Sequence, residues 1–214
     1  MAKTFLLALI IVASSSIASA QADYKRWEIF GGYSHNLVDN ASADFDFDPN
    51  TGEINAKHAG FNGFNAAITR NFSRYFGAKG DVSGHHSSTT APFGQIARGV
   101  VIKSSLYNFL SGAQIKDNAT ESTFKPFAHA LAGVAYSRNR FTLTNEFCIA
   151  IVPSPCPVSE VASETGFAGA VGGGLDIRAT NRFDIRAIQI DYNPTRLGDS
   201  MPNNFRIGVG LVFH

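Results

Sequence analysis

The stretch Asn204-Phe-Arg-Ile-Gly-Val-Gly-Leu-Val-Phe213 alternates between two kinds of side chain. On one face of an extended strand every side chain is apolar, namely Phe205, Ile207, Val209, Leu211 and Phe213. The other face is polar or small, apart from Val212. A membrane-crossing strand of about 10 residues has this pattern, with apolar side chains toward lipid and aromatic rings at both interfaces. The stretch therefore predicts a strand of a transmembrane β-barrel.

The first 20 residues have the features of an export signal. Lys3 supplies a positive charge, Phe5–Ala13 is an apolar run, and Ala18-Ser-Ala20 has the small-x-small form of a signal-peptidase site. The apolar run is shorter than the ~18 residues that a spanning helix needs. We therefore expect residues 1–20 to be removed and residues 21–214 to form one barrel domain.

The composition favours many short strands and argues against a nucleic-acid partner. The chain has 214 residues, of which only 16% are charged, 20 are Gly and 18 are Phe. The net charge is +1 and the sequence has no run of basic residues. Cys148 and Cys156 lie close together beyond the export signal, in a Pro-rich stretch. In an oxidising compartment this spacing predicts a local disulfide.

Eight segments of the chain alternate in the manner of the last one, and each is expected to be a strand. They are Arg26–His35, Gly60–Thr69, Tyr75–His85, Ile102–Ala113, Lys125–Ser137, Thr165–Arg178, Phe183–Tyr192 and Asn204–Phe213. The fourth is ambiguous, because either phase of Leu106–Leu110 is acceptable. The seventh changes phase, since Asp184 and Asp191 differ in parity, and this predicts a β-bulge near Ala187–Ile188 or a bend into a loop there.

The gaps between these segments alternate in length. They run long (36–59), short (70–74), long (86–101), medium (114–124), long (138–164), short (179–182) and long (193–203). Bacterial barrels have short periplasmic turns, long extracellular loops and both termini in the periplasm. The order therefore predicts an all-β, eight-stranded antiparallel up-and-down barrel.

Alternation alone does not say which face is inside, and a soluble lipocalin-like ligand-binding barrel would read in the same way. Three features favour the membrane orientation, and the first is the aromatic strand on which the sequence ends. Aromatic residues end the apolar faces, as in a girdle, and include Trp27, Tyr136 and Phe213. The opposite faces are rich in Gly and Ala, which suit a narrow lumen better than a water-facing surface.

Charged side chains of both signs are expected inside the barrel. They are Glu28, Lys79, Asp81, Asp176, Arg178, Arg186, Asp191 and Arg206. The interior of an eight-stranded barrel is only wide enough for side chains, so these charges must pair with one another. We therefore predict a filled lumen that is not a large open pore, with a small porin-like channel as an alternative.

The chain resembles the OmpA-like (opacity-type) family of eight-stranded outer-membrane β-barrels. The resemblance lies in the export signal, Trp27–Tyr33, Lys125–His129, Gly172–Asp176 with Arg186–Tyr192, and the final strand. It implies a place in the outer membrane among lipid and lipopolysaccharide, and recognition of the last strand by the barrel-insertion machinery. The family usually ends on the aromatic residue, whereas His214 follows Phe213 here. The resemblance is weak for activity, because the family includes anchors, adhesins and small porin-like proteins.

Two stretches carry side chains that could form a site of chemistry. The acidic stretch Asp44, Asp46, Asp48 and Glu53 could wrap a cation, but Pro49 and Asn55 replace the Gly and Glu of an EF-hand, so a solvated loop is favoured. His85-His-Ser-Ser88 lies where a lipid A-modifying enzyme (an acyl hydrolase or transferase) would place a His and a Ser, but no orienting acid is evident. His129 is expected to face the lumen. We expect no metal, cofactor or reaction, and a monomer with a structural or surface-interaction role whose extracellular partner is unknown.

Overall fold

The computed structural model describes residues 24–38, 45–47, 54–56, 59–93, 96–119, 122–143, 159–198 and 203–214. Its strands are β1 (Trp27–Val38), β2 (Phe45–Phe47), β3 (Ile54–Ala56), β4 (Ala59–Asn71), β5 (Phe76–Phe93), β6 (Ile96–Lys116), β7 (Phe124–Leu143), β8 (Ser159–Arg178), β9 (Phe183–Tyr192), β10 (Thr195–Arg196) and β11 (Asn204–Phe213). Within these ranges no helix is long and apolar enough to cross a membrane.

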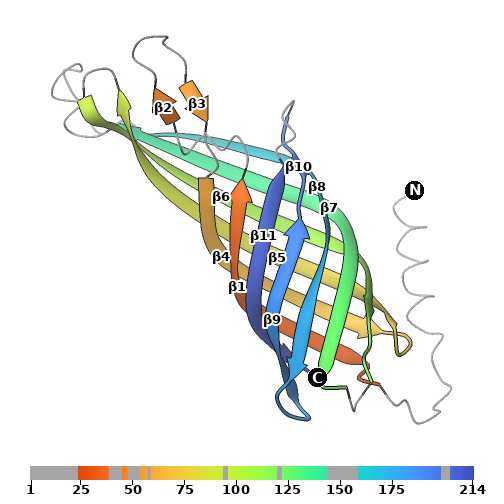
Figure 1. The fold of residues 1–214 in the computed structure, drawn as a ribbon. Helices are drawn as coiled ribbons and strands as arrows, with labels where there is room; N and C mark the ends of the chain where they lie inside the picture. Colours follow the sequence, from red (N-terminus) through yellow and green to blue (C-terminus); the bar gives the residue numbers. More distant parts are fainter. Residues whose placement is uncertain are drawn as a thin grey trace, which may run out of the picture.

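Eight of the strands close into a ring. Their order is β8-β7-β6-β5-β4-β1-β11-β9, and β9 pairs back onto β8. Every pairing is antiparallel, so consecutive strands of the ring run up and down, as the gap lengths predicted. Figure 1 shows the ring from the side, with the C-terminus at the end that carries the short turns and the β2–β3 hairpin above the opposite end. We call these the turn end and the loop end.

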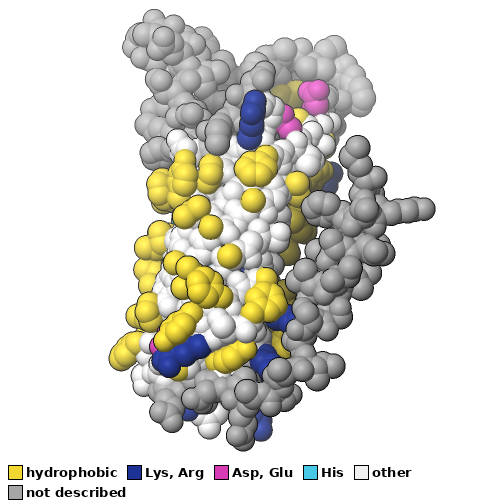
Figure 2. Space-filling model, turned by 90° about the vertical axis from the view of Figure 1, so that its right-hand side faces the viewer, with side chains coloured by type: hydrophobic (Ala, Val, Ile, Leu, Met, Phe, Trp, Pro, Cys, Tyr) yellow, Lys and Arg dark blue, Asp and Glu magenta, His cyan; other side chains and the backbone are white. Residues whose placement is uncertain are grey.

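Apolar side chains cover the outer face of the barrel wall and mainly polar side chains cover the inner face, which is the inverse of a soluble protein. In β1, Trp27, Ile29 and Tyr33 are 51%, 56% and 52% exposed, whereas their chain neighbours Glu28, Phe30 and Ser34 are buried. Figure 2 shows hydrophobic side chains scattered over the outer wall, with Lys and Arg mainly above and below them. A barrel surrounded by lipid has this arrangement, and a lipocalin-like soluble barrel has the reverse. The lipid-facing assignment of the alternating faces is therefore confirmed.

The two irregular segments are settled by the register. In β6, Leu106 and Leu110 face the lumen and Phe109 faces outward, 50% exposed. In β9, Leu175 of β8 pairs with Ile188 and Asp176 pairs with Arg186, so one residue of β9 has no partner across the pair. Ala187 and Ile188 are both exposed, which places the predicted bulge where the change of phase required it.

The strands β5 to β8 are longer than the alternation indicated. β5 and β6 remain paired from the turn end to Phe93 and Ile96, and β7 and β8 remain paired to Thr142 and Ser159. Much of the expected loops 86–101 and 138–164 is therefore strand. The sequence signal stops earlier because the outward side chains beyond the membrane are no longer regularly apolar, as Lys103, Arg138 and Arg140 show, and backbone pairing needs no apolar face.

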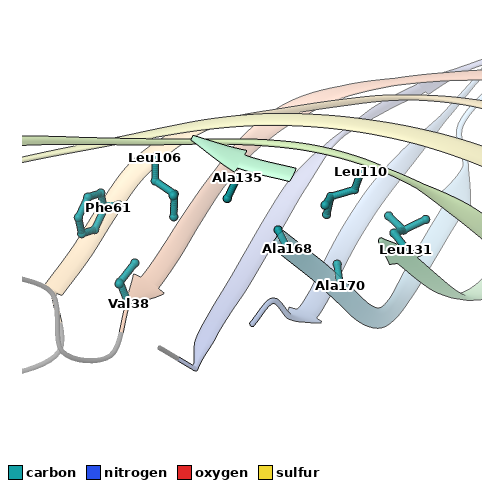
Figure 3. Packing of buried hydrophobic residues seen from close by; sticks show 8 residues of the cluster. All are labelled: Val38, Phe61, Leu106, Leu110, Leu131, Ala135, Ala168 and Ala170. Atoms are coloured by element: carbon teal, nitrogen blue, oxygen red, sulfur yellow. The ribbon is translucent and has the colours of Figure 1, made fainter. Parts of the chain in front are cut away.

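Small and apolar side chains pack inside the barrel beside the polar ones. Figure 3 shows this cluster, which consists of Val38, Phe61, Leu106, Leu110, Leu131, Ala135, Ala168 and Ala170. Ala135, Ala168 and Ala170 have no exposed surface. Alanine at these positions leaves room for the leucines of the facing strands, because an eight-stranded barrel is only as wide as its side chains.

A groove of about 570 Å³ opens on the outer wall, not in the lumen. Ala66, Gly80 and Ser111 are small outward-facing residues in it, and Ile68 and Phe109 are among its larger ones. It lies within the apolar surface, where lipid chains surround a membrane barrel.

Candidate functional site

The most distinctive group of side chains is a chain of ion pairs across the barrel interior. At its lower part, Lys116 of β6 places Nζ 2.8 Å from Oε2 of Glu28 on β1 and 2.8 Å from Oδ2 of Asp176 on β8. Arg186 of β9 donates to both oxygens of Asp176, through Nε at 2.8 Å and Nη2 at 3.1 Å. Strands from opposite sides of the ring are thereby linked through the lumen.

The series of ion pairs continues toward the loop end through Gln189 on β9. Arg186 Nη1 donates to Gln189 Oε1 at 2.7 Å, and Gln189 Nε2 donates to Asp191 Oδ2 at 2.6 Å. Arg206 of β11 then donates to Asp191 Oδ2 through Nη2 at 2.7 Å and to Asp81 Oδ1 of β5 through Nη1 at 2.9 Å. Arg206 is thus held by two carboxylates from different strands, the charge-assisted geometry that a guanidinium favours.

Two further side chains complete this upper part. Lys79 places Nζ 3.9 Å from Asp81 Oδ2 and 3.2 Å from His129 Nδ1. His129 faces the lumen, as predicted, and its Nε2 lies 3.0 Å from Asp191 Oδ1, at ion-pair distance but without hydrogen-bond alignment. These contacts leave each buried carboxylate of the upper part near at least one cation.

Aromatic rings hold the guanidinium of Arg186 in place. Its Cζ lies 4.2 Å from the ring centroid of Phe30 and 4.1 Å from that of Phe127. The flat guanidinium therefore lies against two rings while its edge donates hydrogen bonds, a use that lysine could not replace.

A separate ion pair closes the turn end. Lys125 Nζ lies 2.8 Å from Asp184 Oδ2, and His214 Nε2 lies 2.9 Å from the same oxygen. The residue that follows the last strand is therefore attached to the inner side of β9.

The structure places seven of the eight predicted inward charges in one network, and each is at most 2% exposed: Glu28, Lys79, Asp81, Asp176, Arg186, Asp191 and Arg206. Arg178 is apart from them. It is the last residue of β8, beyond the level of the network, and its guanidinium donates to Asn181 in the adjacent turn. Two cations of the interior, Lys116 and Lys125, were not predicted. The parity of β6 would have revealed Lys116 had the strand been continued past Ala113.

The geometry of the interior can hold strands together but provides little room for passage. Its charges are buried and paired, and breaking one such pair costs about 3–5 kcal/mol because a lone charge remains. Arg186 and Arg206 are among the largest fully buried side chains. A solute would have to displace several ion pairs at once.

The histidines considered for catalysis are separated by the barrel wall. His85 is fully buried inside, where its Nε2 lies 2.7 Å from Ser34 Oγ. His86 faces outward, with Nδ1 2.9 Å from Ser105 Oγ and its ring edge-on to Tyr107. Of the residues described, no carboxylate contacts His86. The outer pair therefore lacks the acid that would orient a catalytic histidine.

The remaining predicted sites fall largely outside the described residues. Cys148 and Cys156 lie there, as do Asp44, Asp48 and Glu53. Asp46 is in β2, whose side chains are not described. Elsewhere, in the ranges that the structure describes, no group of three or more His, Cys, Asp or Glu side chains is placed to hold a metal ion.

Comparison with solved structures returns barrels of the same architecture. Ail, the attachment invasion locus protein of Yersinia pestis, crystallised with the heparin analogue sucrose octasulfate, matches with a TM-score of 0.54 and 18% identity over 87% of this chain and 97% of its own. OprG, an outer membrane protein of Pseudomonas aeruginosa, matches with a TM-score of 0.52 and 15% identity over 91% of this chain and 98% of its own. At these identities the likeness shows the fold.

Comparison with curated proteins gave no match. The family model described as "Outer membrane protein beta-barrel domain" matches residues 5–213, nearly the whole chain. The ring of strands, the apolar outer wall and the polar interior agree with this assignment, so the chain belongs to the outer membrane protein β-barrel family and its barrel lies in the outer membrane.

Proposed function

We propose that this protein is a closed outer-membrane barrel that holds an interaction surface outside the cell. The observation that carries the proposal is the continuation of β5 to β8 beyond the membrane as a paired sheet. A strand pair that only anchored the chain could end at the outer aromatic residues Tyr107 and Tyr136, whose rings stack 6.4 Å apart. Instead β7 continues seven residues past Tyr136, to Leu143.

The projecting sheet has two edges that can receive a partner. β4 pairs with β5 only as far as His86, and β10 pairs with β8 only at Phe167 and Ala168. Beyond these points, Ser87–Phe93 pairs only with β6 and Ser159–Thr165 only with β7, and the described residues place no strand on their other side. Unpaired backbone N–H and C=O groups on such an edge are a template for strand addition by another protein. Ail, whose name refers to attachment, has the same fold and supports a surface role by analogy only.

The paired interior supports the closed state of the barrel, and it also weighs against the porin-like alternative. A lipid A-modifying enzyme is less well supported, because the one outward His–Ser pair has no acid within reach among the described side chains. The function supported best is therefore interaction at the surface, with the barrel as its anchor.

The proposal is tested by shortening the projecting β5–β6 hairpin. In the variant, a two-residue Asn-Gly turn replaces residues 89–102, so that Ser88 and Lys103, which pair in the wild type, flank the new turn. Cells that display the wild type should attach to a layer of cultured cells, whose surface proteins could add a strand to the free edge, and the variant should lose most of this attachment. The matched control replaces the β2–β3 hairpin by a short loop, which leaves the β5–β8 sheet intact. Equal attachment by wild type, variant and cells without the protein would overturn the proposal, provided that heat-modifiable gel mobility shows both barrels to be folded.

A further inference from the structure

Three cations lie together on the outward face of β6 and β7, just beyond the membrane-facing surface. They are Lys103, Arg138 and Arg140, which we call the outer basic patch. All three are exposed, and the buried neighbours Ile102 and Ser104 face the opposite way, into the barrel. Figure 2 shows both Lys or Arg and Asp or Glu side chains above the hydrophobic wall at the loop end. No sequence run marks this patch, because strand pairing brings its members together.

The register puts like charges directly opposite each other. Lys103 pairs with Arg140, and Ser105 pairs with Arg138. Directly opposed side chains on one face of an antiparallel pair have Cβ atoms about 4.5–5.5 Å apart, and like charges there are destabilising. The arrangement therefore costs stability unless an anion lies between the cations.

The protein itself does not supply that anion in the part of the chain that is described. No ion pair or hydrogen bond joins a described carboxylate to Lys103, Arg138 or Arg140. Glu160 and Glu164 of β8 pair with Phe141 and Ser137, and so stand on the other face of the sheet. The outward neighbours include hydroxyl and imidazole groups that can donate hydrogen bonds, besides the apolar Val161 opposite Arg140.

Those neighbours are placed by the same register. Ser88 of β5 pairs with Lys103, and Ser163 of β8 pairs with Arg138. His86 and Ser105 lie one step nearer the membrane, 2.9 Å apart. Cations flanked by hydroxyl donors form the kind of surface that binds phosphate oxygens.

The height of the patch identifies the source of the phosphate. The outward face of β6 is embedded from Ile115, at the turn end, to Tyr107, which stacks on Tyr136. The ten residue-to-residue steps from Ile115 to Ser105 span roughly 33 Å along a strand, which a tilt of about 40° reduces to roughly 25 Å, the height of the apolar band of such barrels. Arg138 therefore lies at the level of the outer-leaflet headgroups, and Lys103 and Arg140 lie just above it.

We infer that the outer basic patch binds the phosphate groups of a phosphorylated saccharolipid of the outer leaflet, whose acyl chains lie against the apolar wall below Tyr107 and Tyr136. The lipid phosphate supplies the negative charge that Lys103 and Arg140 share. This inference is independent of the proposed surface role, because it concerns the barrel wall and not the edges of the projecting sheet.

The test compares two matched double variants of the full chain, folded in detergent micelles. Arg138→Gln with Arg140→Gln removes two exposed arginines of the patch, and Arg26→Gln with Arg182→Gln removes two exposed arginines at the turn end. The probe is fluorescent diphosphoryl lipid A. Because a cation near an anionic membrane surface contributes about 1 kcal/mol, the patch variant should bind roughly 10- to 30-fold more weakly, and the control variant should bind like the wild type.

Further arms separate the phosphate sources. With lipid A from which both phosphates have been removed, wild type and patch variant should bind equally. Inorganic phosphate in large molar excess should not displace the lipid from the wild type. Equal binding of diphosphoryl lipid A by the wild type and the patch variant would show the inference to be wrong. So would a patch variant that loses heparin binding but keeps lipid A binding, because the patch would then face a soluble glycan.

Discussion

Arg206 of β11 donates a hydrogen bond to Asp81 of β5, with Nη1 2.9 Å from Oδ1, across 125 residues of sequence and through the centre of the barrel. The same guanidinium donates to Asp191 at 2.7 Å. One side chain of the last strand therefore links two other strands of the ring. This explains how an interior rich in charge can be buried, since each charge meets an opposite one and none is left alone.

Replacing Arg206 by Ala should destabilise the barrel more than it opens a passage. Asp81 and Asp191 would lose their shared cation while they remain buried, at a cost of about 3–5 kcal/mol. The temperature at which the folded gel mobility is lost should fall. The stability of Arg206→Lys should lie between that of the wild type and that of Arg206→Ala, because an ammonium group cannot reproduce the fork of a guanidinium. A variant with wild-type stability would mean that the network contributes nothing.

The outward face of the last strand can be tested by a pair of neighbouring substitutions. Val209 is outward and 45% exposed, so Val209→Arg places a charge against lipid at a cost of about 2–4 kcal/mol and should prevent stable insertion. Gly208 faces inward, and an added Cβ would lie at ordinary contact distances, 3.5 Å or more, so Gly208→Ser should be tolerated. The fraction of each variant with heat-modifiable mobility measures this. The same fraction for both would contradict the assignment of faces.

Cys148 and Cys156, which lie outside the described residues, remain predicted to form a disulfide in the connection between β7 and β8. Removing it should leave the melting behaviour of the barrel nearly unchanged, because the closed ring lies outside the strands. Mass spectrometry of unreduced peptides from normally grown cells should find the linked pair. Two free thiols would refute the prediction.

An ion pair between two turns should make the stability of the folded protein depend on pH, but only at acid pH. Hydrogen bonds from Arg74, at 2.8 and 3.1 Å, lower the pKa of the Asp117 carboxyl below its ordinary value of 3.8. A lowered pKa in the folded state means that the pair stabilises above the unfolded value and that its contribution is lost as the pH falls through the folded value. Wild type and Asp117→Asn should therefore converge in stability as the pH falls below about 4. Their difference should be constant, and small for an exposed pair, between pH 5 and 8. A difference that changed between pH 5 and 8 would contradict this cause.

The faces of the strands could be predicted because lipid and lumen impose opposite demands on adjacent residues. The change of parity between Asp184 and Asp191 even located the bulge at Ala187–Ile188. Which face of Leu106–Leu110 points outward could not be predicted, because Leu106 and Leu110 make one face apolar and Tyr107 and Phe109 do the same for the other. It is set by the neighbours, since Tyr107 pairs with Tyr136 on the outer face.

Features that arise from pairing between strands were harder to predict from the sequence. The sequence indicated which charges face inward but not that Arg186 would join Asp176 while Arg178 joined Asn181. The outer basic patch was invisible, because Lys103 and Arg140 are far apart in the chain and become neighbours only through the register. The upper ends of β5 to β8 were expected to be loops, since a strand with water on both faces has no alternation to reveal it.

If the paired charges fill the lumen, the purified wild type should not form an open pore, and its conductance in planar bilayers is the decisive measurement. With Lys116, Arg186 and Arg206 bound across the interior, we predict no steady large conductance, only small or rare openings. Liposomes that contain the protein should likewise not swell in sugar solutions. A reproducible channel that passes such solutes would show that the interior is open and that the account of a filled barrel is wrong.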